Sequence, residues 1–328
     1  MVNSSELPMA ARDYGHFGVT ADPEAFGLVT SVALTSAGPI TVRHGRRSGR
    51  DDARAIILLH GAAGSWSTFT PLLSAADLGA TGGAYASFED LVIPDLAGWG
   101  DSALATRAED RSIEVVAASV AEVARSLGYD RWMIVGHSLG GFVALELAAA
   151  EQTATERVLL VSPTTFGVAA AVRQPFRELR NLPAYVGMLG VMLVLARLGR
   201  FGTRFVALIG PTRFFRRSMG PLFAHPGRIA QSVYRALAAE ARPLSFVLAS
   251  ACAGEYDARR WAGIRCPVRS LRGSRDVFVA DDDHVRLAAT IPDFVGGILD
   301  DAGHFGQIER PVEVLERLFP ATRASAAS

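Results

Sequence analysis

From residue 28 onward, short apolar runs alternate with longer segments of helical periodicity, and this alternation narrows the possible folds to a few. The runs span residues 28–34, 40–44, 55–60, 91–94, 132–136, 157–162, 267–273 and 297–300. Helical patterns lie at residues 112–127, 140–150, 281–289 and 312–318. The first two runs flank a Ser-Ala-Gly-Pro turn and predict an antiparallel hairpin, whereas the others resemble strands buried on both faces. The sequence therefore predicts an α/β fold with a mostly parallel eight-stranded sheet and helices on both faces.

One long segment interrupts this alternation. Between residues 163 and 263 no run is typical of a strand, and apolar helical segments are separated by prolines, namely Pro175, Pro183, Pro211, Pro221, Pro226 and Pro243. We expect a helical lid at residues 163–263, inserted into a core domain formed by residues 28–162 and 264–328. Residues 1–27 are expected to form an irregular lead-in. The longest apolar run, residues 184–196, has 13 residues where a bilayer needs about 20, so no stable membrane insertion is expected.

Composition excludes several classes of protein. The chain carries 33 basic and 33 acidic side chains, so nucleic acid is not expected as its main partner. Every basic residue is Arg, which excludes enzymes that need a Lys nucleophile or a phosphate-loop Lys. The two cysteines, Cys252 and Cys266, exclude a disulfide framework or a cysteine zinc site. The histidines lack metal-ligand spacing and no dinucleotide fingerprint follows the first strand, so neither metal nor cofactor is expected. Residues 1–10 do not resemble a secretory signal, which favours a cytoplasmic location.

The sharpest local motif is Gly136-His137-Ser138-Leu139-Gly140, which follows a predicted strand and precedes a predicted helix. This G-x-S-x-G pattern is typical of a tight strand-to-helix turn, in which Gly avoids collisions on either side of a strained Ser. The turn would expose the hydroxyl of Ser138 above the edge of the sheet. It would also place the amide of Leu139 at a helix N-terminus, where it could stabilise an oxyanion.

A second motif, His60-Gly61-Ala62-Ala63-Gly64, directly follows a buried apolar run. Small residues here allow the backbone to approach a ligand closely. The amide of Ala62 is our candidate for a second oxyanion donor. The alternative interpretation is a simple turn, because His-Gly pairs often follow strands without any functional role.

Together these motifs make the chain resemble an α/β-hydrolase of the cap-bearing serine esterase, lipase and C–C hydrolase type. The resemblance covers residues 28–162 and 264–319, and it includes the loop Asp95-Leu96-Ala97-Gly98-Trp99-Gly100-Asp101-Ser102. It implies the α/β-hydrolase fold, with the helical segment of residues 163–263 where this family carries its lid. The motifs are specific for the fold and far less specific for the substrate.

The resemblance also implies an acid and a base. Asp276 ends a Gly-Ser-Arg-Asp turn after a predicted strand, and His304 lies in a Gly-His turn after the last one. In this family the His takes the proton of the nucleophilic Ser, and the acid orients the imidazole. The competing carboxylates, Asp281, Asp282 and Asp283, are more typical of a solvated helix start. Chain order Ser138, Asp276, His304 is the order of this fold.

Three further residues are expected beside the substrate. Trp99 lies in the loop that flanks the cavity in the family, where it would line the acyl pocket or simply pack within the loop. Gly61 and His137 belong to the two motif turns, and His137 is also expected to orient backbone.

Serine at position 138 favours acyl transfer to water, because dehalogenases and epoxide hydrolases of this fold use Asp. We therefore expect a serine hydrolase that acts on a small apolar carboxylic ester or related acyl compound. The alternatives are a C–C bond hydrolase, a lactonase, a thioesterase or a biosynthetic cyclase, and a non-catalytic small-molecule receptor. Residues 173–217 carry nine Arg against one Glu, which indicates a solvated basic face, attraction of an acidic substrate group or transient contact with an anionic membrane. Oligomeric state has no signature in the sequence.

Overall fold

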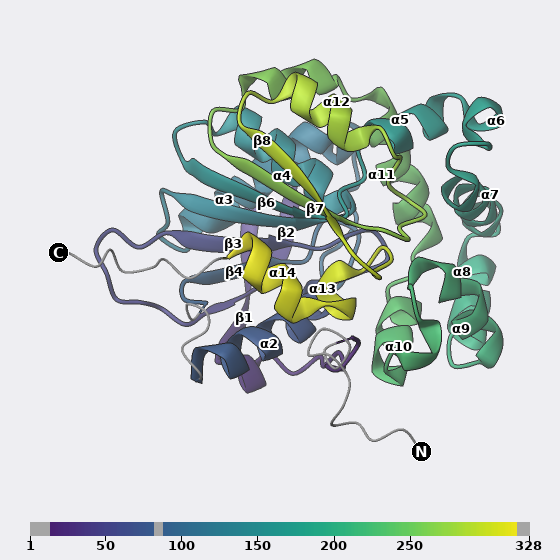
Figure 1. Ribbon diagram of the computed structural model, residues 1–328, viewed down its shortest axis with the longest axis horizontal. Helices are drawn as coiled ribbons and strands as arrows, with labels where there is room; N and C mark the ends of the chain where they lie inside the picture. The colour runs from purple at the N-terminus through teal and green to yellow at the C-terminus, as the bar shows by residue number, and fades with distance from the viewer. Residues whose placement is uncertain (1–13, 82–87, 320–328) are drawn as a thin grey trace.

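The computed structural model describes residues 14–81 and 88–319 and contains one eight-stranded sheet (Figure 1). The strands are β1 (Leu28–Thr35), β2 (Gly38–Gly45), β3 (Ala55–Leu59), β4 (Leu91–Pro94), β5 (Trp132–His137), β6 (Thr155–Val161), β7 (Val268–Gly273) and β8 (Phe294–Leu299). Their order is β1-β2-β4-β3-β5-β6-β7-β8, with β2 antiparallel to β1 and β4 and all other pairs parallel. The predicted fold class is confirmed.

The central strands are apolar throughout because both faces of the sheet are covered. In β3, Ile57 and Leu59 belong to a core cluster with helices α3 (Ile113–Ser126) and α4 (Leu139–Ala150). Leu58, which points to the opposite face, belongs to a second cluster with α2 (Thr70–Thr81) and α14 (Pro311–Leu318). Side chains alternate across a strand, so a continuous apolar run supplies both cores. The remaining elements around the sheet are α12 (Asp283–Thr290), α13 (Gly306–Glu309) and the short 3-10 turns Glu24–Phe26, Trp66–Phe69, Glu109–Arg111 and Ala258–Gly263.

The last strand begins three residues before the predicted run. β8 pairs with β7 from Phe294 opposite Val268 to Leu299 opposite Gly273. It is one of the two edge strands, and most of its residues are exposed or half-buried. Gly296 and Gly297 interrupt the large apolar residues of this strand, so the apolar pattern alone does not locate its start.

Between β6 and β7 the chain forms helices only. These are α5 (Phe166–Arg173), α6 (Pro175–Glu178), α7 (Pro183–Arg197), α8 (Arg200–Ile209), α9 (Arg213–Met219), α10 (Gln231–Ala239) and α11 (Pro243–Glu255), with 3-10 turns at Gly220–Leu222 and Pro226–Arg228. We call α5–α11 the helical insertion. Three of its prolines begin helices, where the missing N–H has no cost. In Figure 1, α6–α10 lie at the right of the molecule, beside the sheet rather than over its faces.

The helical insertion shares a third apolar cluster with the loops that follow the strands. Phe278, after β7, and Phe305, after β8, pack with insertion residues such as Leu189 and Phe246. No single helix in the described residues is long and apolar enough to cross a membrane; α10 and α11 meet that test only as a pair bent by 78°.

Candidate active site

Ser138 occupies a strained turn between β5 and α4. Its backbone has φ 52° and ψ −120°, a positive φ that L-residues seldom adopt. The flanking glycines make the turn possible: a Cβ on Gly136 would lie 2.6 Å from the carbonyl oxygen of Gly140, and one on Gly140 would overlap the carbonyl oxygen of Leu59. The turn therefore places the Ser138 side chain at the carboxyl end of the central strands.

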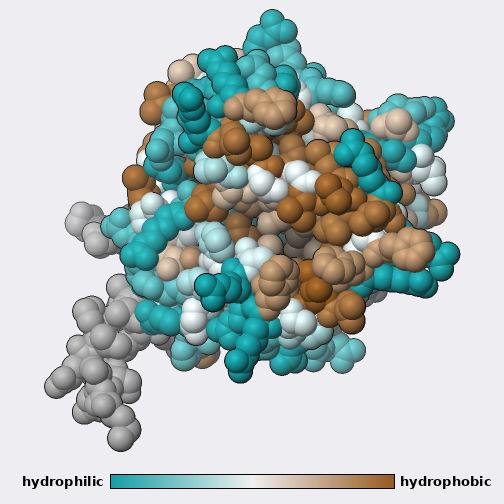
Figure 2. Space-filling view, turned by 90° about the vertical axis from the view of Figure 1, so that its right-hand side faces the viewer, coloured by the Kyte–Doolittle hydropathy of each residue, from teal (hydrophilic) through white to brown (hydrophobic). Residues whose placement is uncertain are grey.

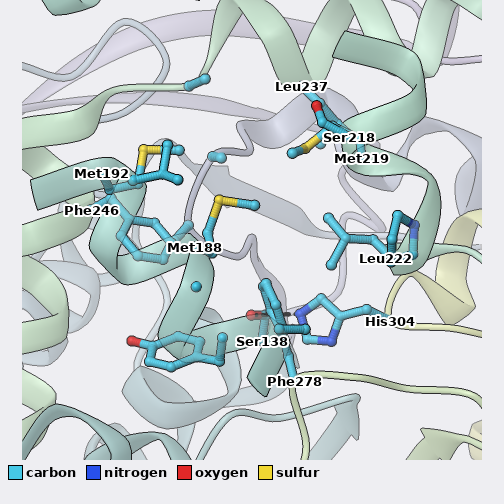
Figure 3. A pocket seen from close by; sticks show the side chains of 18 of the residues that line it. Ser138, Met188, Met192, Ser218, Met219, Leu222, Leu237, Phe246, Phe278 and His304 are labelled. Carbon is cyan, nitrogen blue, oxygen red and sulfur yellow. Dashed lines mark hydrogen bonds between the residues drawn. The ribbon is translucent and has the colours of Figure 1, made fainter. Parts of the chain in front are cut away.

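The side chains of Ser138, His304 and Asp276 converge, although they follow three different strands. Nε2 of His304 lies 2.9 Å from Oγ of Ser138, as the dashed line in Figure 3 shows. On the other side of the ring, Nδ1 lies 3.0 and 3.1 Å from the two carboxylate oxygens of Asp276. All three side chains are buried. With Nδ1–H donating to the carboxylate, Nε2 is left as an acceptor for the Ser138 hydroxyl.

The surroundings of Asp276 favour its charged form. Burial alone would raise the pKa of this carboxyl, but the adjacent His304 imidazole and the backbone N–H of Phe278 hold the pKa below its ordinary value. The N–H of Phe278 donates to Oδ1 over 2.8 Å. Asp276 is therefore a carboxylate at neutral pH, as a group that orients an imidazole must be.

Two backbone N–H groups lie near Ser138 without hydrogen bonds to other described residues. They belong to Leu139, the first residue of α4, and Ala62, in the loop after β3, and both residues line the same cavity as Ser138. His60 fixes the Ala62 loop from below: its Nδ1–H donates to the carbonyl of Gly61, and its Nε2 accepts from the N–H of Leu96. The two N–H groups are available to a ligand oxygen.

His137 is buried beneath this arrangement, and it supports the backbone instead of facing the cavity. Its Nε2 lies 2.9 Å from the carbonyl oxygen of His304, so the ring donates there and holds the His304 turn. Burial, and next the nearby His304, lower the pKa of His137 to about 3. The ring is therefore neutral throughout the neutral and mildly acidic range.

This depressed pKa predicts acid instability. In the unfolded chain His137 becomes protonated below its ordinary pKa of 6.5, whereas in the folded protein it stays neutral until the pH falls to its pKa of about 3. The unfolded state therefore binds more protons in this window, and stability falls as the pH falls. Between pH 7 and pH 5, His137 alone is expected to lower the free energy of unfolding by about 2 kcal/mol.

Urea titrations at pH 7 and pH 5 measure this loss. His137→Gln, whose amide nitrogen can still donate to the carbonyl of residue 304, should lose about 2 kcal/mol less than the native protein over the same interval. Asp283, whose burial raises its pKa to about 6, acts in the opposite direction in both proteins and cancels in the comparison. An identical loss in the variant would mean that His137 does not titrate as its burial demands.

A cavity of about 530 Å³ opens beside Ser138 and His304, between the carboxyl ends of the strands and the helical insertion. Its lining is almost entirely apolar and rich in Met and aromatic side chains, as Figure 3 shows for Met188, Met192, Met219, Phe246 and Phe278. Among the described residues, none that lines it is Arg, Asp or Glu. Its polar groups are few: besides Ser138 and His304, they include Thr164, Tyr185, Ser218 and Ser250. Such a cavity suits an apolar, uncharged ligand.

The structure places the three residues expected beside the substrate outside this lining. Trp99 is buried against a different, small pocket of about 30 Å³, with its ring edge-on to His60. It is thus a packed loop aromatic, the other interpretation of that residue. Gly61 packs closely against Ser138, because a Cβ there would lie 2.8 Å from the Cβ of Ser138. His137 holds the His304 turn, as described above.

Asp283 differs from the solvated helix start expected of residues 281–283. Asp281 and Asp282 are exposed, but Asp283 is fully buried. Its carboxyl accepts hydrogen bonds from the N–H groups of Gly167, 2.9 Å away, and Ala280. It therefore joins the start of α5 to the loop after β7, a structural role that an acidic tripeptide does not indicate.

No sequence motif marks Glu309, which also contributes to the candidate site. This buried carboxyl accepts hydrogen bonds from the N–H groups of Gly303 and Phe305, on both sides of His304, and of Ala224 in the helical insertion. The hydroxyl of Tyr14 donates to it as well. The N–H of His304 itself donates to the carbonyl of Leu222 over 2.8 Å. The His304 turn is thus attached to the helical insertion at several points.

Comparison with known proteins identifies the family of this chain. Residues 56–317 match the sequence profile of the alpha/beta hydrolase family, and the chain belongs to that family. The chain is 25% identical over 258 residues to the 2-hydroxy-6-oxo-6-phenylhexa-2,4-dienoate hydrolase of Burkholderia cepacia, covering 78% of this chain and 82% of that protein. This confirms the predicted membership of the α/β-hydrolase superfamily.

Solved structures share the fold at low sequence identity. Carboxylesterase CesB (YbfK) from Bacillus subtilis superposes with a TM-score of 0.61 at 17% identity, covering 90% of this chain and 94% of that one. The epoxide hydrolase CorEH gives a TM-score of 0.63 at 17% identity, covering 89% and 98%. The described residues contain no group of three or more His, Cys, Asp or Glu side chains arranged to hold a metal ion.

Proposed function

We propose that the protein is a serine hydrolase that cleaves an apolar, uncharged carboxylic ester through an acyl-enzyme. The observation that carries this proposal is the hydrogen-bonded series Ser138–His304–Asp276 at the end of an apolar cavity. Family membership supports hydrolysis, and the carboxylesterase among the structural neighbours is consistent with an ester substrate.

In the proposed reaction, Oγ of Ser138 attacks the ester carbonyl while Nε2 of His304 takes its proton. The carbonyl oxygen becomes an oxyanion that the N–H groups of Ala62 and Leu139 stabilise. His304 then protonates the departing alcohol, which leaves an acyl group on Ser138. Water, deprotonated by His304, attacks this acyl group and releases the carboxylic acid and the free serine. Asp276 keeps the imidazole in the required tautomer and stabilises its cation.

The helical insertion serves as the lid in this proposal. It supplies most of the apolar cavity lining, and its carbonyl at Leu222 and N–H at Ala224 contact the His304 turn and Glu309. A cover of this kind excludes water and strengthens the electrostatic interactions beneath it. The lid corresponds to residues 163–263, between the two parts of the core domain.

A C–C hydrolase is the second candidate, because one relative is by name a dienoate hydrolase. A dienoate is a carboxylate, and a carboxylate buried in a cavity needs a positive partner. No described residue that lines this cavity is an Arg, and the chain has no Lys. The charge of the cavity lining therefore favours a neutral ester over a dienoate.

A substrate panel tests this choice. We expect kcat/KM for p-nitrophenyl esters to rise from the acetyl to the hexanoyl chain, because each buried CH₂ contributes about 0.8 kcal/mol, or about four-fold. An ester with a terminal carboxylate on the acyl chain should react at least about 100-fold more slowly than its neutral analogue of equal length, because its charge would be buried without a partner. Release of p-nitrophenol is followed by absorbance, with Ser138→Ala as the blank. Preference for the carboxylate-bearing ester, or turnover of the dienoate alone, would reject the proposal.

A further inference from the structure

The helical insertion contains many more basic than acidic residues. Residues 179–239 contain nine Arg and neither Asp nor Glu. Five of these, Arg197, Arg200, Arg204, Arg213 and Arg217, are exposed on or beside α7, α8 and α9, and none forms an ion pair with another described residue. None of them lines the cavity, so they do not serve to attract a substrate group there.

Large apolar side chains lie exposed among these arginines. Phe201 and Leu208 on α8 are 67% and 73% exposed, and Phe214 on α9 is 66% exposed. With Val191, Val194 and Phe205 they form what we call the apolar cap face. On α8 the residues at 201, 205 and 208 follow helical spacing, while Arg200 and Arg204 flank them and Gly202 and Val206 face inward. Figure 2 shows apolar side chains gathered around a hollow on this side of the molecule, with hydrophilic residues at the rim.

The apolar cap face borders the cavity of the candidate active site. Val191, Phe205 and Phe214 are exposed and also line that cavity. An apolar compound on this face thus has a continuous apolar route toward Ser138. Exposing such side chains together to water is unfavourable. A contiguous apolar patch on a protein surface therefore marks a site of contact with an apolar partner.

We propose that the apolar cap face docks on an anionic lipid surface. Helices rich in Arg and in exposed Phe and Leu lie in the lipid interface, with their cations near anionic headgroups. A second copy of this chain is disfavoured as the occupant, because a two-fold contact would bring the same arginines against one another. The further step, in which ester substrate passes from the lipid into the cavity, rests on the proposed function; docking itself does not.

Sedimentation with lipid vesicles tests docking without any activity assay. Vesicles of phosphatidylcholine alone are compared with vesicles containing roughly 30 mol% phosphatidylglycerol. Binding to the anionic vesicles is expected, with weak binding to the neutral ones. The variant R197Q/R200Q/R204Q should bind on the order of 100-fold more weakly, since each Arg near an anionic surface contributes about five-fold. The control R50Q/R107Q/R131Q removes three exposed arginines from the core domain and should bind like the native protein.

A second pair of variants tests the apolar contribution. F201S/L208S, whose residues are exposed and outside the cavity lining, should lower vesicle binding at least ten-fold. The control V32S/L34S removes exposed apolar side chains from β1 and should have no effect. All four multiple variants, the two Arg variants and the two apolar variants, should leave hydrolysis of a soluble ester unchanged. Loss of docking and failure of the proposed function are therefore separate results.

Three outcomes would overturn the proposal. The first is equal affinity for neutral and anionic vesicles, and the second is no vesicle binding at all. The third is a native protein that self-associates in analytical ultracentrifugation and becomes monomeric in F201S/L208S, which would assign the apolar cap face to a second copy of the chain.

Discussion

Replacing Ser138 by alanine is expected to lower kcat for a soluble ester by about 10⁶-fold. Alanine has no hydroxyl to attack the carbonyl, so the acyl-enzyme cannot form, and only the binding of the ester and of its oxyanion remains. The affinity for a neutral ester should change little, because the cavity is lined by apolar side chains that the substitution does not alter. The substitution is not expected to destabilise the fold, because Ala carries the same Cβ as Ser and the strain of the positive φ at this residue is unchanged.

Activity assays at high enzyme concentration measure the residual rate. Intact-protein mass spectrometry after treatment with a fluorophosphonate shows whether a reactive hydroxyl is present. The native protein should gain one phosphonyl adduct and Ser138→Ala none. Ser218→Ala is the matched control: this residue lines the same cavity and donates to the carbonyl of Phe215, away from His304. It should keep kcat within a few-fold. A Ser138→Ala protein that retained a tenth of the native rate would place the nucleophile elsewhere.

The predicted fold depended on features that are local in sequence. Buried strands such as β3 and β5 are continuous apolar runs, because α-helices cover both faces of the sheet. β8 is different: Gly296 and Gly297 interrupt its apolar residues, and pairing with β7 extends the strand on the other side of them to Phe294. Pairing between distant segments is a tertiary property, which explains the misplaced boundary.

The candidate site shows the same division. The turn at Ser138 could be predicted because it requires glycine at nearby positions, where a side chain would collide with the backbone. Asp276 and His304 lie in turns that carry little information alone, and their assignment depended on resemblance to a family. The burial of Asp283 and the contacts of Glu309 depend on Gly167, Tyr14 and Ala224, which lie far away in the sequence. A carboxylate that accepts backbone hydrogen bonds is indistinguishable in sequence from one that faces water.

For Trp99 the sequence left two interpretations open, a pocket residue or a packed loop aromatic. Its loop matches the family loop beside the cavity, but the loop conformation depends on Asp95, which accepts hydrogen bonds from the N–H groups of Trp66 and Asp101 and pairs with Arg43. These contacts hold the loop against the sheet domain, and the indole packs into a separate pocket. Motif position alone therefore does not determine which side chain reaches the substrate.

Replacing Asp276 by asparagine is expected to lower kcat by about 10⁴-fold, through the tautomer of His304 and not through loss of the fold. In the native structure Oδ1 accepts from the N–H of Phe278, and an amide oxygen can keep that bond. The amide NH₂ then takes the place of Oδ2, faces Nδ1 of His304 and donates to it. The imidazole proton moves to Nε2, which can no longer accept a proton from Ser138.

Asp283→Asn is the matched control, because it also replaces a buried carboxyl that accepts two backbone hydrogen bonds after β7. Its kcat should stay within a few-fold of the native value, since Asp283 contacts α5 rather than His304. Steady-state kinetics and urea titrations of both variants separate loss of chemistry from loss of stability. If Asp283→Asn lost the larger factor in kcat, the orienting acid would be residue 283. A 10⁴-fold loss confined to Asp276→Asn, with both proteins folded, would leave the Asp276–His304 contact as the cause, because the two variants change the same functional group at nearly the same depth.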